Sequence, residues 1–306
     1  MILKKPNFWD LKKPNTAAIL LLPLSKLYEL VLKFKKREKK LYKDIKTICI
    51  GNIYIGGTGK TSLAIKFKEI LDKKNIKSCF IKKFHKNQID EQKLLSKYGK
   101  TFIASTRDDA LKEAISQKYQ FAIFDDGLQD KSIKYDFEFV CFNKINGMGN
   151  SLTIPAGPLR ENINCLTDYK NIFLNGNLED TSRIKDNLKK INPKLNIYES
   201  KYVPTNIDDF NKQEKYLAFS GIGNHGTFIS MLKSKNFNIM EDIEFPDHYR
   251  FKKKDLKKIL SIAAEKKLKI LTTEKDYLRL ILSDTSKINY IKSKLDIDNE
   301  KKINDI

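Results

Sequence analysis

The sequence predicts an α/β protein, and three observations support this fold class. Strand-like and helical stretches alternate from residue 45 to residue 143, which is typical of a mainly parallel sheet covered by helices on both faces. A glycine-rich stretch, 51–62, joins the first strand to the first helix. A loop rich in glycine and proline, 146–161, interrupts the rhythm, and a second alternating set follows it. The first set has expected strands at 45–53, 76–82, 101–105, 120–125 and 137–143, and expected helices at 62–74, 90–99 and 107–118.

These patterns divide the chain into four expected segments. Residues 1–40 would form an interfacial helix with a basic flank, and residues 41–150 a core that carries the glycine-rich loop. Residues 151–283 would form a second, smaller α/β unit that closes a cleft. A polar tail rich in lysine and aspartate would follow at 284–306. Open parallel sheets bind ligands beyond the carboxyl ends of their strands, so we expect the site there.

The composition is that of a folded chain with a heavily charged surface. Of its 306 residues 41% are hydrophobic and 32% are charged, and the formal net charge is +21 at pH 7. Such a charge is typical of chains that bind nucleic acid or an anionic membrane. Lysine is abundant along the whole length, however, and no arginine-rich or aromatic-basic repeat accompanies it. We therefore expect no nucleic-acid partner.

The four cysteines and three histidines do not predict a structural zinc site, because their spacing is not that of metal ligands. Cys49, Cys79 and Cys141 lie within apolar strand-like stretches, where a cysteine is usually a small buried hydrophobic residue. This usage suits a reducing compartment.

The N-terminal region combines an apolar stretch with a basic one. The apolar residues 17–32 are interrupted by Pro23, Lys26 and Glu29, and the basic stretch 33–40 follows. The apolar part is too short and too interrupted to cross about 30 Å of hydrocarbon. The positive charge follows the apolar part and no small-residue cleavage site is evident, so a secretory signal fits poorly. We expect an amphipathic helix in the membrane interface, with a helix packed on the domain as the alternative.

The stretch GNIYIGGTGKTS, 51–62, has the context of a phosphate-binding loop without its full pattern. The pattern G-x-x-x-x-G-K-[ST] requires a glycine where this chain has Tyr54. A strand precedes the loop and an amphipathic helix follows it, so backbone N–H groups and a helix N-terminus would meet a phosphate. Lys60 would reach the terminal phosphates, and Thr61 would bind Mg²⁺. The residues expected to hold the phosphates are Gly56, Gly57, Thr58, Gly59, Lys60 and Thr61.

Asp125 and Asp126 end the expected strand 120–125. Two aspartates before a glycine are, taken alone, most often a turn. Beside a phosphate loop, a carboxylate at the tip of a buried strand is the usual anchor for Mg²⁺. The loop therefore favours a metal site at this strand end.

Phosphate, magnesium and lysine would serve an ATPase motor, a switch or a kinase. Ile55 occupies the place where dimerising ParA-like ATPases carry a lysine, which argues against that group. A kinase needs a base near the acceptor hydroxyl, and the candidates are Asp90 or Glu91 and the pair Asp247–His248. Each of these taken alone is more often a helix cap or a structural pair. The residues leave open a kinase at a membrane surface and a P-loop ATPase or switch that acts with a protein or nucleic-acid partner.

Eight separated stretches, in order between residues 51 and 276, together resemble one family. They are GNIYIGGTGKTS, DEQKLL, STRDDA, DDGLQD, IPAGPLRE, FSGIGN, FPDHYRF and TTEKD. The chain resembles the tetraacyldisaccharide 4'-kinases of lipid A biosynthesis, whose own loop lacks the first glycine. The resemblance implies transfer of the ATP γ-phosphate to the 4'-hydroxyl of an acylated glucosamine disaccharide phosphate, giving lipid IVA.

The resemblance also implies an architecture and a location. The expected fold is a P-loop kinase-type α/β/α sandwich with a second, smaller α/β unit, a short β linker between them and the active site in the cleft. The N-terminal helix would dock the protein on the cytoplasmic face of the bacterial inner membrane, on anionic lipid. The implied cofactors are ATP and Mg²⁺, and we expect the chain to act as a monomer.

The family motifs imply catalytic roles for individual residues. Asp90 of DEQKLL matches the catalytic base, and His248 of FPDHYRF matches its partner. A carboxylate oriented by an imidazole would accept the proton of the sugar hydroxyl as it attacks. Lys60 would stabilise charge on the phosphates, and Arg107 and Arg160 would neutralise phosphate of the nucleotide or of the lipid.

The same motifs imply a metal site at the strand end. Thr61 and Asp126 would hold Mg²⁺, and Asp125 would join the catalytic residues beside it. Gln129 and Glu161 would complete the metal site.

The chain departs from the family pattern in three single positions and in one stretch of three residues. Ser62 stands where proline is usual, Asp130 where histidine is usual, and Tyr249 where a second histidine is frequent. The residues 82–84, Lys-Lys-Phe, replace an arginine-glycine-tyrosine stretch. The roles of Asp130 and of residues 82–84 therefore stay open.

Overall fold

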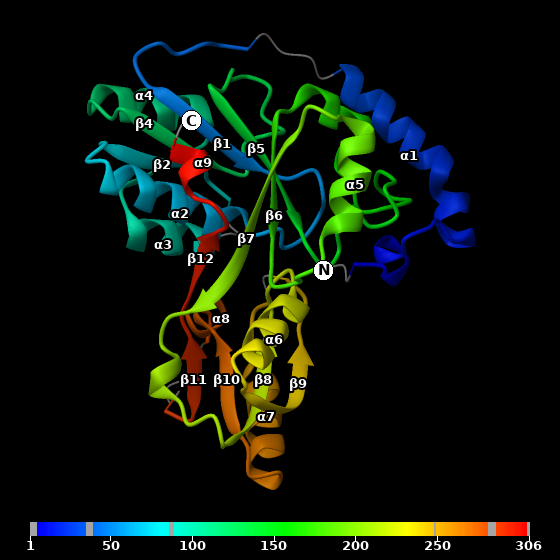
Figure 1. Ribbon diagram of the computed structural model, residues 1–306, viewed down its shortest axis with the longest axis vertical. Helices are drawn as coiled ribbons and strands as arrows, with labels where there is room; N and C mark the ends of the chain where they lie inside the picture. The colour runs from blue at the N-terminus through cyan, green and yellow to red at the C-terminus, as the bar shows by residue number, and fades with distance from the viewer. Residues whose placement is uncertain (1–4, 35–38, 86–88, 248, 281–285, 305–306) are drawn as a thin grey trace.

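The computed structural model describes residues 5–34, 39–85, 89–247, 249–280 and 286–304. Within these ranges the chain forms two sheets, each covered by helices on both faces, and a helix near the N-terminus lies beside the larger one (Figure 1). The α/β class expected from the alternating pattern is confirmed.

The larger sheet has, in the described part of the chain, eight strands in the order β12-β7-β6-β5-β1-β4-β2-β3. All neighbouring strands are parallel except β12, which is antiparallel to β7. The strands are β1 (Lys46–Gly51), β2 (Ser78–Lys83), β3 (Thr101–Ala104), β4 (Phe121–Asp125), β5 (Phe137–Asn143), β6 (Asn171–Asn175), β7 (Asn196–Pro204) and β12 (Ser293–Ile297). The central strands read as continuous apolar runs because both faces are covered.

The helices on the two faces of this sheet belong to two separate cores. Residues of α4 (Arg107–Ser116) and α5 (Ser182–Ile191) pack in the core on one face. Residues of α2 (Lys60–Lys73), α3 (Ile89–Tyr98) and α9 (Lys301–Asn304) pack in the core on the other.

The smaller sheet has, among the residues that the structure describes, four parallel strands in the order β11-β10-β8-β9. These are β8 (Lys215–Ser220), β9 (Asn238–Glu244), β10 (Lys269–Thr273) and β11 (Ile288–Ile291). The helix α6 (His225–Ser234) covers one face and α7 (Lys253–Glu265) covers the other. The short elements are α8 (Glu274–Tyr277) and the 3₁₀ turns η1 (Asn7–Asp10), η2 (Ile163–Asp168) and η3 (Ile207–Asp209).

Strand pairing divides the chain differently from the expected boundary at residue 150. β6 and β7 follow that position, yet they extend the larger sheet beside β5. β12, from the expected polar tail 284–306, returns to pair with β7, and its Leu295 and Ile297 are buried. The second unit of the described chain is therefore built on β8 to β11 rather than on all of 151–283. The chain crosses between the units twice, from β7 to β8 and from β11 to β12.

The glycine-rich loop lies at the point where the order of the larger sheet reverses. β1 lies between β4 and β5. The chain leaves β1 towards β2, near one edge of the sheet, and it leaves β5 towards β6, in the direction of the other edge. Crevices at such a point, beyond the carboxyl ends of the strands, are where open α/β sheets bind ligands. The expected position of the site is thus built into the topology.

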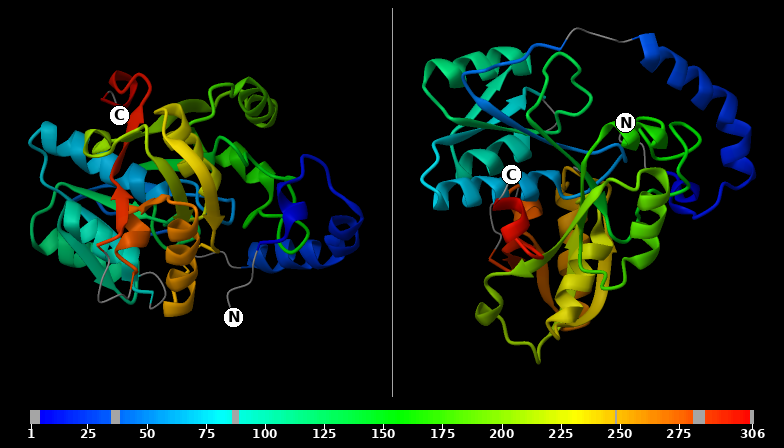
Figure 2. Two further views of the ribbon diagram at one scale, coloured as in Figure 1. Left: turned by 90° about the horizontal axis from the view of Figure 1, so that it is seen from below. Right: turned by 45° about the horizontal axis from the view of Figure 1, so that its top comes forward.

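The N-terminal helix α1 (Thr16–Phe34) lies along the outside of the larger unit (Figures 1 and 2). One face is fixed by hydrogen bonds: the Ser25 hydroxyl donates to the Thr153 carbonyl at 2.9 Å, and the Tyr28 hydroxyl donates to the Arg160 carbonyl at 2.8 Å. The helix also exposes the large apolar residues Ile19, Leu20, Leu24, Leu27, Leu30, Val31 and Phe34. Among the described residues, no helix has the length and apolar character needed to cross a membrane. The basic flank expected at 33–40 falls partly outside the described residues.

Candidate active site

The glycine-rich loop turns directly into α2, and Gly59 makes the turn. Gly59 has a φ of +82°, a backbone conformation in which a larger side chain is strained. A Cβ at this position would also lie 2.6 Å from the Tyr202 hydroxyl. The helix starts at the next residue, Lys60, so its N-terminus lies at the wall of a cleft. Backbone N–H groups and the helix dipole there favour an anion such as phosphate.

Thr58 has a supporting role within the loop. Its hydroxyl accepts a hydrogen bond from Asn52 Nδ2 at 3.0 Å, and its carbonyl accepts one from Asn175 Nδ2 at 2.7 Å. The Ser200 hydroxyl in turn donates to Asn175 Oδ1 at 2.5 Å. The loop is therefore tied to the end of β1 and to the neighbouring strands β6 and β7.

Tyr54, which replaces the first glycine of the motif, anchors the loop to the N-terminal segment. The side chain is buried, and its hydroxyl accepts a hydrogen bond from Lys5 Nζ at 2.9 Å and donates one to Asp10. Asn146 Nδ2 lies 3.3 Å from the same hydroxyl. The position that departs from the pattern thus serves as a tertiary contact behind the loop.

Asp125, at the carboxyl end of β4, is paired with the loop threonine. Thr61 Oγ1 donates to Asp125 Oδ2 at 3.1 Å, and Lys82 Nζ lies 2.6 Å from the same oxygen. Asp125 is fully buried, so its charge requires these partners. The arrangement brings the end of β4 to the first turn of α2.

Asp126, the next residue, faces other partners. Its φ is +62°, and its carboxylate lies 3.1 Å from Arg160 Nη1 and 3.8 Å from Lys60 Nζ. Arg107 donates a hydrogen bond to its carbonyl. Burial raises the pKa of the Asp126 carboxyl, but Lys60 and Arg160 lower it by more, and the resulting pKa is about 2. Asp126 is therefore ionised at neutral pH.

Gln129 and Glu161 lie at the edge of this cluster. Gln129 accepts a hydrogen bond from Arg160 at 3.2 Å and donates one to Glu161 at 3.2 Å. Arg107 also pairs with Asp130, at 3.3 Å, in the place where the family usually has a histidine. The structure therefore brings together every expected residue of the strand-end cluster.

The oxygens at this strand end suit Mg²⁺, which is usually bound through one or two carboxylates together with substrate phosphates. Within the described part of the chain, no three histidine, cysteine, aspartate or glutamate residues form a metal cluster. Asp125 Oδ1 is buried and has no hydrogen-bond partner among the described residues. The Thr61 hydroxyl and the Asp125 carboxylate thus offer a hard oxygen pair beside the phosphate loop.

The candidate base Asp90 lies in the first turn of α3, and its side chain is not among the described ones. Its expected partner, His248, lies outside the described residues. The neighbouring Glu91 lines the cleft and pairs with Lys82 at 2.6 Å and with Lys275 at 3.1 Å. The start of α3 therefore forms part of the cleft wall.

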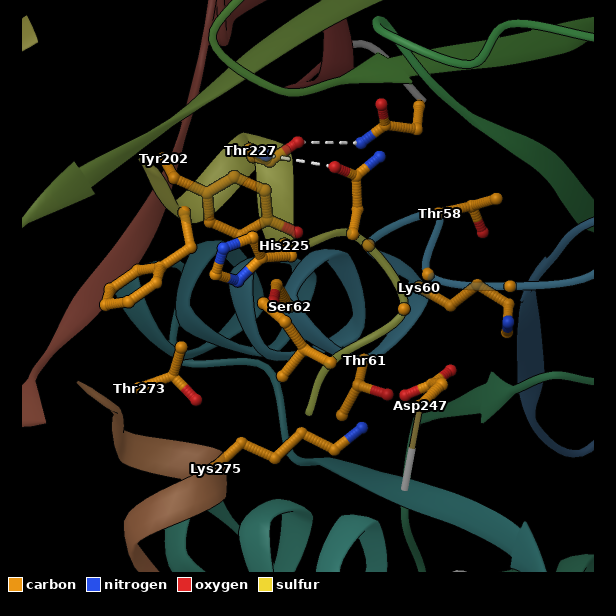
Figure 3. A pocket seen from close by; sticks show the side chains of 18 of the residues that line it. Thr58, Lys60, Thr61, Ser62, Tyr202, His225, Thr227, Asp247, Thr273 and Lys275 are labelled. Atoms are coloured by element: carbon orange, nitrogen blue, oxygen red, sulfur yellow. Dashed lines mark hydrogen bonds between the residues drawn. The ribbon is translucent and has the colours of Figure 1, made fainter. Parts of the chain in front are cut away.

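The cleft between the two units has a volume of about 950 Å³. Figure 3 shows some of the side chains that line it, from the glycine-rich loop and α2, from β7 and α6, and from the loop at Asp247, β10 and α8 of the smaller unit. A Cβ on Gly57 would lie 2.7 Å from Gly223 Cα, so the two loops meet backbone to backbone. The labelled residues are Thr58, Lys60, Thr61, Ser62, Tyr202, His225, Thr227, Asp247, Thr273 and Lys275.

Several residues of this cleft carry no motif that sequence reasoning singled out. His225 accepts or donates hydrogen bonds with Ser220 at 2.7 Å and with Asp242 at 2.8 Å, and so ties α6 to β8 and β9. Tyr202 comes from a strand that was expected in the second unit. Lys82 is buried behind the cleft wall, where it pairs with Glu91, and it did carry a signal, because a lysine inside an apolar parallel strand needs a carboxylate partner.

A phosphate loop at the switch point of a parallel sheet places the chain in the class of P-loop phosphate-transfer proteins. The tetraacyldisaccharide-1-P 4'-kinase family (LpxK) matches residues 17–306. A tetraacyldisaccharide 4'-kinase of Pelagibacter ubique is 58% identical over 303 residues, which cover 99% of this chain and 96% of that protein. One of Rickettsia typhi is 33% identical and covers 95% and 91% of the two chains.

The fold is also similar to that of a solved member of this family. The crystal structure of LpxK from Aquifex aeolicus, an "apo" form in complex with ATP, aligns with a TM-score of 0.66 at 22% identity, over 94% of this chain and 97% of that one. The chain therefore belongs to the tetraacyldisaccharide-1-P 4'-kinase family. Its activity is that of a lipid A 4'-kinase. Of the two functions that the residues left open, the kinase is therefore confirmed, and the ATPase or switch that acts with a partner is not.

Proposed function

We propose that this chain transfers the γ-phosphate of ATP, in the presence of Mg²⁺, to the 4'-hydroxyl of a tetraacyldisaccharide 1-phosphate held at a membrane surface. One observation carries the proposal: the phosphate loop, its Thr61–Asp125 pair and the first turn of α3 lie around one cleft. Donor, metal and base would thus meet between the two units.

The phosphates of ATP would lie against the loop 56–61 and the N-terminus of α2. Lys60 would shift from Asp126, 3.8 Å away, to the terminal phosphates, and Arg160 and Arg107 would stabilise the charge that spreads over them. The depressed pKa of Asp126 supports this role, since its negative charge holds both Lys60 and Arg160 at the strand end.

Thr61 and the carboxylates of Asp125 and Asp126 would hold Mg²⁺, with Gln129 and Glu161 beside them. When bound, the ion would neutralise charge on the β- and γ-phosphates. The support is the short distance between Thr61 and Asp125 and the unpaired buried oxygen of Asp125.

Asp90 would accept the proton of the 4'-hydroxyl, oriented by His248. The support is its position in DEQKLL and in the first turn of α3, beside Glu91 on the cleft wall. A helix N-terminus favours negative charge, and this location suits the proposed role of Asp90 as a base.

We further propose that α1 lies in the interface of the bacterial inner membrane, on its cytoplasmic face. Its polar contacts with the loop 153–160 leave an apolar surface exposed, as in helices that lie in the plane of a bilayer. The acylated acceptor would reach the cleft from the same surface. A monomer, the expected state, would suffice because one chain provides every proposed site residue.

The base role can be tested with Asp90→Asn, which preserves shape and removes the charge. The measurement is formation of the phosphorylated disaccharide from labelled ATP and the tetraacyl acceptor in detergent. We expect the rate to fall by a factor of about 100 or more, while the affinity for ATP, measured by equilibrium binding, stays within about threefold of the wild type.

Asp72→Asn, on an exposed turn of α2 away from the cleft, is the matched control and should keep the full rate. Full activity in Asp90→Asn would remove this residue from the mechanism. Absence of the phosphorylated product in the wild type itself would contradict the proposed reaction.

A further inference from the structure

Lys82 is a buried charge that the reaction scheme above does not use. It lies on β2 and is only 2% exposed. Phe80 and Lys82 share a strand face because side chains alternate, and Phe80 belongs to the core that also contains residues of α2 and α3. An ammonium group at such a site is costly to bury unless carboxylates surround it.

Two carboxylates from different elements meet this ammonium group. Lys82 Nζ lies 2.6 Å from Asp125 Oδ2 and 2.6 Å from Glu91 Oε2. Two carboxylates at this distance stabilise the ammonium form of a buried lysine. The lysine therefore bridges the end of β4 and the first turn of α3, two segments that are distant in the sequence.

The bridge continues in both directions. On one side Asp125 accepts the hydrogen bond of Thr61 at 3.1 Å. On the other side Glu91 Oε1 pairs with Lys275 of the smaller unit at 3.1 Å. A continuous line of charge-assisted contacts thus runs from the phosphate loop, through Lys82, to the smaller unit.

We propose that Lys82 is a positioning residue, which fixes the start of α3 relative to the Thr61–Asp125 pair and so sets the distance between the acceptor side and the phosphate side of the cleft. This inference rests on the proposed function, because Asp90 precedes Glu91 on the same helical turn. An ammonium with three donors suits the position, since it holds two carboxylates at once and leaves Asp125 Oδ1 unpaired.

The first test compares Lys82→Met with Lys83→Met. Methionine has a similar length without the charge, and Lys83, the next residue, leaves β2 on the opposite face. We expect Lys82→Met to lower kcat by about 10- to 100-fold, which is the scale of a small misplacement of reacting groups. KM for ATP and the equilibrium affinity for ATP should stay within about threefold, and Lys83→Met should match the wild type.

A conservative variant and a double variant show whether a lower kcat comes from misplaced groups or from a loss of folded protein. Rates are expressed per ATP-binding site, so unfolded chains do not contribute. Lys82→Arg should recover most of the kcat, because a guanidinium also pairs with two carboxylates. The double variant Lys82→Met/Glu91→Gln should be no slower than the slower single variant, since residues that act as one unit are not additive.

The proposal is overturned if Lys82→Met keeps the wild-type kcat, or if its effect multiplies with that of Glu91→Gln. It is also overturned if the loss lies in the affinity for ATP alone. A wild type that makes no phosphorylated glycolipid would instead contradict the proposed function. If Lys82→Met binds no ATP because it does not fold, Glu91→Gln carries the same test: unchanged kcat there overturns the bridge.

Discussion

Asp126 is a cleft residue whose ionisation is set by the cations around it. The side chain is 18% exposed, and Lys60 and Arg160 approach it from the loop and from the segment after β5. Its pKa in the folded chain is about 2, below the ordinary value of 3.8. A depressed carboxyl pKa means that the folded state binds this proton less readily than the unfolded state does.

The sign of the pH dependence follows from this shift. The stability that ionised Asp126 contributes is fully present above the unfolded pKa near 4 and is lost as the pH falls towards 2. A shift of this size corresponds to about 2 kcal/mol. The unfolding free energy of the wild type, measured by urea denaturation, should fall between pH 5 and pH 2. In Asp126→Asn this fall should be smaller by about 2 kcal/mol. The exposed Asp72→Asn should follow the wild type, and parallel curves for all three proteins would contradict the assignment.

The sequence predicted which residues lie at the end of β4, but it did not predict which side chains they contact. The motif placed Asp125 and Asp126 together, and the resemblance assigned the metal to Asp126. The structure pairs Thr61 with Asp125 and surrounds Asp126 with cations. Successive residues at a strand end point in different directions, and that direction depends on a backbone φ of +62° that no motif encodes.

At the scale of elements, α1 has two faces with different chemistry. The buried Ser25 both donates to the Thr153 carbonyl and accepts from the Ala156 amide, at 2.9 and 3.0 Å. A polar face fixed in this way leaves the leucines of the opposite side exposed, among them Leu20 and Leu27. Exposed apolar surface in one continuous helix is typical of a site that contacts protein or membrane.

The proposed lipid-facing role of α1 predicts that substitutions on its exposed face weaken membrane binding without lowering the stability of the fold. Leu20→Glu/Leu27→Glu should weaken sedimentation with anionic phospholipid vesicles at least tenfold, since two leucines would each contribute about 1.5 kcal/mol or more on insertion. The melting temperature should change little, because neither residue is buried in the fold. Leu178→Glu, another exposed leucine outside α1, is the control and should bind as the wild type does. Unchanged sedimentation of the double variant would contradict the interfacial position of α1.

Helices and strands were predictable where a short stretch of sequence specifies them. The strand at 45–53, the glycine-rich loop and the helix at 62–74 follow from apolar runs and a loop motif, and they appear as β1, the loop and α2. The partners of β6, β7 and β12 were not predictable in this way. β12 pairs with β7 across about 90 residues, and only tertiary packing selects such a partner over a nearer strand.

At the scale of the whole molecule, the two units touch at the phosphate loop and at α3. Gly57 and Gly223 meet backbone to backbone, and a Cβ on Gly223 would lie 2.1 Å from the Gly57 amide nitrogen. Two residues of the smaller unit, Lys275 and Glu274, form ion pairs with α3. Lys275 pairs with Glu91, and Glu274 pairs with Lys97. The smaller unit therefore contacts both the phosphate loop and α3, which would carry the proposed base.

This arrangement predicts that a single methyl group at Gly223 separates the units. Its backbone has no positive φ, so alanine is tolerated locally, but the methyl group forces the loop away from Gly57. Overpacking of this kind costs about 1 to 3 kcal/mol, which the interface between units would relieve by opening. Gly223→Ala should then lower kcat by about tenfold or more, because proximity of the reacting groups is lost. Gly226→Ala, where the nearest atom to a Cβ is 3.5 Å away, is the control and should keep its kcat. Wild-type kinetics in Gly223→Ala would mean that kcat does not depend on the contact between Gly57 and Gly223.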